Sequence, residues 1–537
     1  MLRLTGQAVA VSTLSGCSLK SKKPEVSSHG RVSGDPVGRA VGEEILAAGG
    51  NAIDAAMAAT LAICVTSPQR SGIAGYGGHM VIALAGGERI TSIDFNCTAP
   101  LAAREDMYPL DDKGAVQGQA NFAGWRAVAI PGTLAGIQLA IISYGTKPFR
   151  ELVQPAIKFA RDGYEVPAAQ ANTMRTMAAR LRKDPGSAKL YLKDGEPLQA
   201  GDLARNPDLA DLLTTLAQQN SVDAFYRGDI GKRIVEGIRK NGGLITAQDM
   251  AAYRAREVAP IKFSWAGCEI CTAPLTAGGL TVLQALTFLK ALAWENIAPG
   301  PVSAHARLEA LRVAWKDRVE LLGDPQKAQV PTARLLSMEY AREVAERIQT
   351  AVQGQKPLEQ QISKGVQHGT TNISAVDRQG NMAIVTFTQG GSFGSQVTLD
   401  GLGLTLGHGM SRFNPLPGHP NAPGPGKRPL HNMCPTVVLR EGRPVLGVGA
   451  QGGVRIPNTI FEVLAQYVGR GRSMEEAMAA PRLHCMGTTG VEMESIWPAD
   501  EQEYLQQIGF QVTRGIGATT SAVSFNPKSG DCHAVFR

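Results

Sequence analysis

Thr370 is the residue of this sequence whose type and position suggest the most specific chemistry. It follows Gly369 and precedes Thr371 and a run of strand-forming residues. A threonine hydroxyl inside a chain is a poor nucleophile, because no nearby group need accept its proton. If the bond before Thr370 were cut, its α-amine, with a pKa of about 7.7 to 8.0, would act as a base for the same residue's hydroxyl. Gly369 would permit the strained backbone in which the hydroxyl attacks the preceding carbonyl.

Gly-Thr-Thr alone is a weak signal, since polar strand starts often have this composition, and two other glycine-rich segments compete with it. Residues 390–394 fit the nucleophile elbow, which would make Ser392 the nucleophile, but the elbow requires a helix directly after it, and residues 395–401 favour strand and turn. Residues 447–452 fit a dinucleotide fingerprint but lack the second strand ending in an acidic residue about 20 positions later. We therefore expect neither site, and no cofactor.

The cysteines and histidines show no convincing metal-ligand spacing. Cys268 and Cys271 could form a redox or metal pair, but they fall in an expected strand rather than at a helix start, where the dipole would lower a thiol pKa. We interpret them as structural. His79, His305 and His484 are isolated, so structural or surface roles are favoured. No metal is expected.

The type of secondary structure expected around Thr370 changes at that residue. Apolar spacings of three and four predict a mostly helical first two thirds, whereas alternating apolar residues predict strands after residue 370. The expected helices cover residues 36–48, 51–65, 131–144, 149–162, 228–240, 277–292, 302–322, 455–469 and 473–480. The expected strands are Ile373–Val376, Met382–Thr388, Thr436–Arg440 and Val445–Val448, with a loop rich in proline and glycine at 415–429. This order fits two independent domains or one layered α+β domain.

The composition is that of a globular protein: 537 residues, 43% of them hydrophobic and 19% charged. The formal charge of +7 comes from 54 basic and 47 acidic residues. We find no basic stripe interleaved with aromatic residues, so a nucleic-acid partner is not expected. The longest apolar run, residues 52–65, is shorter than the roughly 20 residues of a membrane-spanning helix. It predicts a buried helix instead.

Residues 1–27 suggest export. Arg3 precedes a short apolar stretch, and Leu14-Ser15-Gly16-Cys17 resembles the lipobox of bacterial lipoproteins, which would place a lipid anchor on Cys17. The charged and apolar parts are both short for a signal peptide, so an upstream start and an accidental match are the alternatives. We expect a signal and tether here, and an exported protein of the periplasm or cell envelope.

The motifs around Thr370 resemble those of the gamma-glutamyltranspeptidases. The resemblance after residue 369 lies in Thr370-Thr371, Asp377 to Asn381, Thr386-Phe387-Thr388, Gly426 to Leu430, Pro435-Thr436 and Gly452-Gly453. Before residue 369, the resemblance lies in residues 49–56, 71–73, 131–133 and 144–146. The order of these motifs is highly specific and spans about residues 28–537. The resemblance implies a four-layer αββα sandwich of the N-terminal-nucleophile hydrolase type. It also implies cleavage between Gly369 and Thr370, giving a large-subunit segment, 28–369, and a small-subunit segment, 370–537, in one intertwined catalytic domain.

The resemblance also implies roles for individual residues. Thr370 would be nucleophile and, through its amine, base, and Thr388 would orient it. The backbone N–H groups of Gly452 and Gly453 would form an oxyanion hole, which agrees with their place before an expected helix.

Several positions depart from the family's pattern for binding a γ-glutamyl group. A serine pair that contacts the substrate carboxylate is replaced by His431-Asn432, and the positions that bind the α-amine are Gly390, Gly409 and Arg412. The arginine expected before Asp106 is Glu105, with Arg104 one position earlier, so either of these two would face the site. A substrate ammonium would lose its acceptors and lie near a like charge.

We therefore expect a self-processing threonine hydrolase that cleaves a small-molecule amide and passes the acyl group to water or an amine. Glutathione-type γ-glutamyl chemistry is the family default. An acylase of shifted specificity, acting on an anionic amide without a free α-amine, and a non-catalytic lipid-anchored binding protein are the alternatives.

Overall fold

The computed structural model describes residues 28–360, 370–515 and 517–537. Cys17 of the expected lipobox and Gly369 of the expected cleavage site lie outside these residues. Within the described ranges, no helix combines the length and apolarity needed to cross a bilayer.

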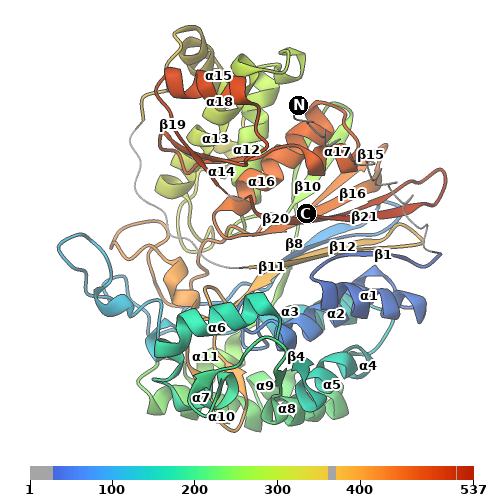
Figure 1. Cartoon of the computed structure of the whole chain (residues 1–537), viewed down its shortest axis with the longest axis vertical. Coiled ribbons are helices and arrows are strands. Elements are labelled where there is room, and N and C mark those ends of the chain that lie inside the picture. The colour runs from blue at the N-terminus through green and yellow to red at the C-terminus, as the bar shows by residue number, and fades with distance from the viewer. Residues whose placement is uncertain (1–27, 361–369, 516) are drawn as a thin grey trace, which may run out of the picture.

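Two six-stranded sheets form the centre of the molecule (Figure 1). The first has the order β1 (Gly30–Gly34), β11 (Thr371–Asp377), β12 (Met382–Thr388), β2 (Gly77–Ala83), β3 (Ile90–Asp94) and β8 (Arg256–Val258). The second has the order β21 (Cys532–Phe536), β20 (Thr519–Phe525), β16 (Arg443–Gln451), β15 (Thr436–Arg440), β10 (Cys268–Thr272) and β9 (Ile261–Trp265). Neighbouring strands are antiparallel throughout both sheets. Each sheet takes strands from both sides of residue 370, as the layered alternative expects.

The two sheets contact each other through a shared apolar cluster. Val81, Val376 and Ile384 come from the first sheet, and Val437 and Val523 come from the second. All five side chains are fully buried. The mixed α+β class predicted from the sequence is confirmed by this arrangement.

Helix α2 (Ala52–Thr66) is buried along its whole length and packs against α1 (Pro36–Ala47) and β11. Its only charged residue, Asp54, closes a capping box with Asn51 and accepts hydrogen bonds from the Thr146 hydroxyl and backbone N–H at 2.5 and 3.0 Å. A buried carboxylate is tolerated because N–H and O–H donors surround it. This explains why an acidic residue interrupts the longest apolar run.

Other helices enclose the two sheets, with those before β8 below them and α12 to α18 above them in Figure 1. The lower group includes α3 (Thr133–Tyr144), α4 (Phe149–Leu152), α5 (Gln154–Asp162), α6 (Ala168–Leu181), α7 (Pro185–Tyr191), α8 (Pro207–Gln219), α9 (Asp223–Tyr226), α10 (Asp229–Lys240) and α11 (Ala247–Ala252). The upper group comprises α12 (Gly279–Ala291), α13 (Pro301–Leu321), α14 (Thr332–Leu335), α15 (Met338–Gln353), α16 (Arg455–Leu464), α17 (Met474–Ala479) and α18 (Ala499–Gln507). Short strands complete the fold: β4 (Tyr164–Glu165), β5 (Leu192–Lys193), β6 (Glu196–Pro197), β7 (Leu203–Ala204), β13 (Thr398–Leu399), β14 (Leu404–Thr405), β17 (Leu483–His484), β18 (Gly490–Met493) and β19 (Gln511–Arg514).

The expected elements are found, with two corrections. The single helix expected over 149–162 is two helices that meet at Val153, because Pro155 has no N–H to continue the hydrogen-bond ladder. The α-helix expected over 455–469 ends at Leu464 and continues as a π-helix over Ala465–Gly469.

The cysteines of the described chain are buried thiols, without disulfides. Cys268 packs in the core above the second sheet, whereas Cys271 lies in the cluster between the sheets. The two side chains therefore occupy opposite faces of β10 and cannot act as a pair. Their interpretation as structural residues is confirmed.

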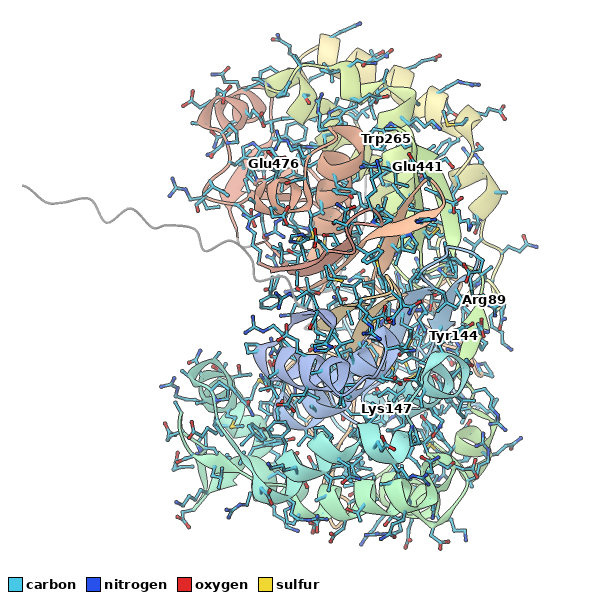
Figure 2. The ribbon with its side chains drawn as sticks, turned by 90° about the vertical axis from the view of Figure 1, so that its right-hand side faces the viewer. Arg89, Tyr144, Lys147, Trp265, Glu441 and Glu476 are labelled. Carbon is cyan, nitrogen blue, oxygen red and sulfur yellow. The ribbon has the colours of Figure 1, made fainter. Side chains whose placement is uncertain are left out.

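A surface cluster ties the end of α3 to the first sheet. Arg89 and Tyr144 lie side by side in Figure 2, and the Arg89 Nε donates to the Tyr144 hydroxyl over 3.2 Å. Both residues also contact the Glu257 carboxylate of β8, with Arg89 Nη2 at 2.6 Å. Figure 2 also labels Trp265 and Glu441. They lie at the Cys268–Arg440 end of the β10–β15 pair, whereas residue 433 precedes the other end, where Thr272 pairs with Thr436.

Candidate active site

Thr370 lies directly before β11 and is 6% exposed. The β11–β12 register pairs Thr371 with Phe387, so its continuation by one residue places Thr370 beside Thr388. The Thr388 hydroxyl donates to the Arg70 carbonyl over 3.2 Å and accepts from the Gly390 N–H over 2.8 Å. Thr388 is therefore fixed next to the predicted nucleophile.

Thr370 lines a small pocket together with four other residues predicted from the sequence. These are Gly453, Arg412, His431 and Asn432. The remaining lining residues are Tyr76 and Met433, which the sequence did not single out. Residues separated by up to 377 positions are thus brought together around one hydroxyl.

Gly452 and Gly453 connect β16 to α16 in a backbone conformation that favours glycine. Their φ angles are +143° and +64°, and a Cβ on Gly452 would lie 2.9 Å from the Cβ of Ala518. Among the described residues, neither backbone N–H donates a backbone hydrogen bond. Two N–H groups at the start of a helix, one of them in the wall of the Thr370 pocket, can stabilise a developing oxyanion.

Two arginines give this region a positive charge. Arg412 lines the pocket, and its Nε donates to the Leu430 carbonyl over 3.4 Å. Arg318 of α13 lies behind the pocket wall, where its Nη2 donates to the His431 carbonyl over 2.5 Å and to the Asn432 Oδ1 over 3.1 Å. In the described part of the chain, no carboxylate forms an ion pair with either guanidinium.

The pKa values of both arginines reflect this environment. Burial, together with the nearby Arg412 cation, lowers the pKa of Arg318 to about 9. Burial also lowers the pKa of Arg412, despite the opposing influence of Tyr76 and Cys97. Both side chains would be stabilised by an anion in the pocket.

Gly390 and Gly409 leave no room for the acidic or amide side chains that the family resemblance implies at these positions. A Cβ on Gly390, whose φ is +106°, would lie 2.2 Å from the His408 Nε2. A Cβ on Gly409 would lie 2.6 Å from the Cys97 Sγ. The space is filled by His408 and Cys97, so the site lacks acceptors for a substrate ammonium at both positions.

His408 is neutral in this packing. Burial lowers its pKa to about 3. Its Nε2 accepts a hydrogen bond from the Gly391 N–H, so Nδ1 carries the proton and donates to the Ser411 hydroxyl, 2.5 Å away. The ring therefore adds no positive charge to that of the two arginines.

Arg104 and Glu105 do not line the pocket at Thr370, contrary to the prediction that one of them faces the substrate. Both are exposed on the surface. Arg104 pairs with Asp106 over 3.1 Å, and Glu105 accepts from the Gly418 N–H over 2.8 Å. The Glu105 carboxylate is thus held by the loop that contains Gly418.

The competing motifs lack the structure they require. Residues 391–394 form turns rather than the start of a helix, so Ser392 is not on an elbow. Both described neighbours of the strand before Gly452 are antiparallel to it, which is not the parallel βαβ unit of a dinucleotide site. His79, His305 and His484 are buried. The described ranges gather no three His, Cys, Asp or Glu side chains that could hold a metal ion.

Arg318 and Tyr76 are the main residues of this region that the sequence interpretation missed. Arg318 follows Leu311, Ala314 and Trp315 at helical spacing, so it continues the buried face of α13. A charge on an apolar helix face was the available signal. Tyr76 stands between two glycines in a segment with no periodic pattern, and only the fold places it near His431, with ring centroids 4.9 Å apart.

Comparisons with known proteins agree with the family resemblance inferred from the motifs. A family described as gamma-glutamyltranspeptidase matches residues 38–535. The chain is 36% identical to the glutathione hydrolase proenzyme of Escherichia coli (strain K12) over 467 residues, 84% of this chain and 80% of that protein. It is 35% identical to the acylase ACY 1 proenzyme of Pseudomonas sp. (strain V22) over 516 residues, 94% and 91% of the two chains.

A solved structure is similar over nearly the full length. The crystal structure of cephalosporin acylase from Bacillus halodurans superimposes with a TM-score of 0.86 at 25% identity, covering 98% of both chains. The resemblance inferred from the motifs is confirmed, and the chain belongs to the gamma-glutamyltranspeptidase family of enzymes.

Proposed function

We propose that this enzyme is a self-processing N-terminal threonine amidohydrolase, in which cleavage after Gly369 makes Thr370 the catalytic residue. The observation that carries the proposal is that Thr370 and Gly453 line one pocket, with Thr388 beside Thr370 in the strand register and Gly452 directly before Gly453. The relatives named proenzymes support processing into two chains, residues 28–369 and 370–537. The packing of two sheets between two groups of helices supports the four-layer αββα sandwich.

In the proposed reaction, the Thr370 hydroxyl attacks the amide carbonyl while its α-amine accepts the proton. The oxyanion that forms is stabilised by the N–H groups of Gly452 and Gly453. Collapse of the tetrahedral species breaks the C–N bond, and the protonated α-amine gives its proton to the departing amine. Water or a second amine then attacks the acyl ester by the same steps and releases Thr370.

The acyl group that fits the pocket best is an anionic one without an α-amine. Arg412 lines the pocket and Arg318 supports its wall. Within the described residues, neither arginine forms an ion pair with a carboxylate. Glycine at 390 and 409, packed against His408 and Cys97, removes two positions that could hold an ammonium. A dicarboxylic acid monoamide would place its distal carboxylate near the arginines.

Hydrolysis of γ-glutamyl amides is the second candidate. It is favoured by the 36% identity to a glutathione hydrolase proenzyme. In that case His431 and Asn432 would contact the glutamyl group from the positions of the family's serine pair. The two candidates share the nucleophile and differ only in the acyl donor. An exported, lipid-anchored location through Cys17 stays a prediction.

Mass spectrometry and activity together test the proposal. The purified protein should give two fragments, with the smaller one beginning at Thr370, whereas Thr370→Ala should give one uncut, inactive chain. Ser392→Ala is the control and should be processed normally. An intact wild-type chain, active or inactive, would refute the proposal, and an inactive one would indicate a non-catalytic binding protein.

The processed enzyme should then hydrolyse glutaryl anilide in preference to γ-glutamyl anilide. These donors differ by the α-amine alone, because both acyl chains have five carbons and the same distal carboxylate. A strong preference for γ-glutamyl anilide would select the second candidate and reject the anionic-acyl assignment.

A further inference from the structure

A groove of about 900 Å³ lies next to the Thr370 pocket and has no role in the reaction as described so far. We propose that it binds the amine half of the substrate, and that this amine is bulky, mainly apolar and without negative charge. This inference rests on the proposed amidohydrolase function. It concerns the leaving group and the acceptor, whereas the arginines concern the acyl group.

The two glycines of the expected oxyanion hole connect the groove to the pocket. Gly453 lines the Thr370 pocket, and Gly452 lines the groove. An amide whose carbonyl oxygen accepts hydrogen bonds from both N–H groups would therefore have its acyl chain on one side and its nitrogen substituent on the other. Gly391 and Ser392 line the same groove, shortly after Thr388, so the groove begins beside the predicted nucleophile.

The walls of the groove are suited to an apolar ligand. They include the rings of Phe122, Phe159 and Tyr164 and the side chains of Val37 and Pro167. Aromatic and aliphatic walls with a few polar groups are typical of small-molecule sites of this size. A methylamine or an ammonia leaving group would leave most of this surface in contact with water.

Three of the four charged residues that line the groove, Asp35, Arg70 and Arg455, are already paired, and the fourth, Glu165, would repel an anion. Arg70 pairs with Asp35 over 2.8 Å, and Arg455 pairs with Glu492 over 2.5 Å. Both arginines line the groove, but neither needs a ligand carboxylate to balance its charge. An amine that carries its own carboxylate, such as a dipeptide, therefore gains little from them.

Two buried amide oxygens also disfavour an anion. In the described part of the chain, the side-chain oxygens of Gln69 and Gln170 have no hydrogen-bond partner, and both residues line the groove. Gln170 is 1% exposed, and its amide nitrogen donates to the Tyr164 hydroxyl over 2.8 Å, which fixes its orientation. An acceptor oxygen repels a carboxylate but can receive a hydrogen bond from a neutral N–H or O–H group.

The test keeps the acyl group constant and changes only the amine. Glutaryl amides of methylamine, benzylamine, 1-naphthylmethylamine and 4-carboxybenzylamine would be hydrolysed by the processed enzyme. We expect kcat/KM to rise about 10-fold or more from methyl to benzyl and again to naphthylmethyl, because each ring buries apolar surface. The carboxybenzyl amide should be hydrolysed more slowly than the benzyl amide.

A matched pair of substitutions on α6 locates the effect. Thr173 lines the groove, whereas Thr176, one turn further on, is exposed and does not. Thr173→Trp should fill the groove and lower kcat/KM for the naphthylmethyl amide about 10-fold or more, with the methyl amide unchanged. Thr176→Trp should behave as the wild type.

The outcomes separate this inference from the function on which it rests. If the processed enzyme hydrolyses none of the four amides, with glutaryl or with γ-glutamyl as the acyl group, the proposed function is wrong. Similar rates for all four amines, or no effect of Thr173→Trp on the naphthylmethyl amide, would reject the groove and leave the proposed function intact.

Discussion

Arg318 donates a hydrogen bond to the backbone carbonyl of His431, so a buried cation of α13 supports the wall of the pocket that contains Thr370. The same guanidinium contacts Asn432. Helix α13 precedes residue 370, and the two wall residues follow it. The charge of the proposed acyl site therefore depends on residues from both sides of the expected cleavage point.

Substitution of Arg412 should separate binding of the acyl anion from the chemistry. We expect Arg412→Gln to lower kcat/KM for glutaryl amides by about 10- to 100-fold, since a hydrogen bond to a charged group contributes about 1.5 to 3 kcal/mol. Pentanoyl amides, which lack the distal carboxylate, should change by less than about threefold. Steady-state kinetics on both series would measure this, with Arg104→Gln on the surface as the matched control. Equal losses for both acyl groups would contradict an anion-binding role.

Thr388 should act by positioning Thr370. Thr388→Val keeps the shape but removes the acceptor of the buried Gly390 N–H, and an unsatisfied buried donor costs about 1 to 3 kcal/mol. We expect kcat to fall about 10-fold or more with little change in KM, and processing to slow as well. Thr388→Ser should restore both, because it restores the hydroxyl. A Thr388→Val enzyme with normal kcat would show that the hydroxyl is dispensable.

Gly452→Ala should impair the chemical step. An added Cβ would meet Ala518 at 2.9 Å and strain a backbone with φ of +143°. Displacement of one oxyanion-hole donor typically lowers kcat by about 10²- to 10³-fold. Gly471→Ala is the control, because Gly471 also has a positive φ, +65°, but has open space around it and lies outside the site. Comparable kcat values for the two variants would refute the role of Gly452.

The buried Glu462 should make stability depend on pH. Burial raises its pKa from 4.5 to about 7, although the Arg307 Nη1 lies 3.3 Å from its Oε2. Because the folded-state pKa is raised, its stabilising contribution is complete below pH 4.5 and is lost as the pH rises to 7. The loss amounts to about 3 kcal/mol, at 1.36 kcal/mol per pKa unit.

Glu462→Gln removes this titration while keeping the size of the side chain. Between pH 5 and 7 the Tm of the wild type should fall relative to that of the variant, because only the wild type loses stability as Glu462 ionises. Thermal unfolding at fixed ionic strength would measure this. Glu441→Gln, on a surface turn, is the control variant. A constant difference for Glu462→Gln would mean that the carboxylate stays ionised throughout this range.

Local signals predicted the helices and the centre of the site. The apolar spacing of residues 51–65 predicted α2, and the turn at 377–381 fixes the β11–β12 hairpin that brings Thr388 to Thr370. The glycine pair before α16 was also visible as a motif. Each of these features depends on residues that are close in sequence.

Long-range pairing explains what the sequence did not predict. The order of strands in the two sheets depends on contacts such as β1 with β11, which join residues more than 300 positions apart. The surface position of Arg104 and Glu105 depends on a hydrogen bond to Gly418 in a distant loop. Arg318 supports the pocket only because α13 packs behind residues 431 and 432. Periodicity along the chain carries no information on such distances.

The mixed origin of both sheets has a mechanical consequence. β11 and β12 are hydrogen-bonded between β1 and β2, and β10 is hydrogen-bonded to β15. A break before Thr370 would therefore release no fragment. Separation of the two segments would break the hydrogen bonds between strands in both sheets and expose the apolar surface between the sheets. The nicked molecule should migrate as a single particle and melt in one transition.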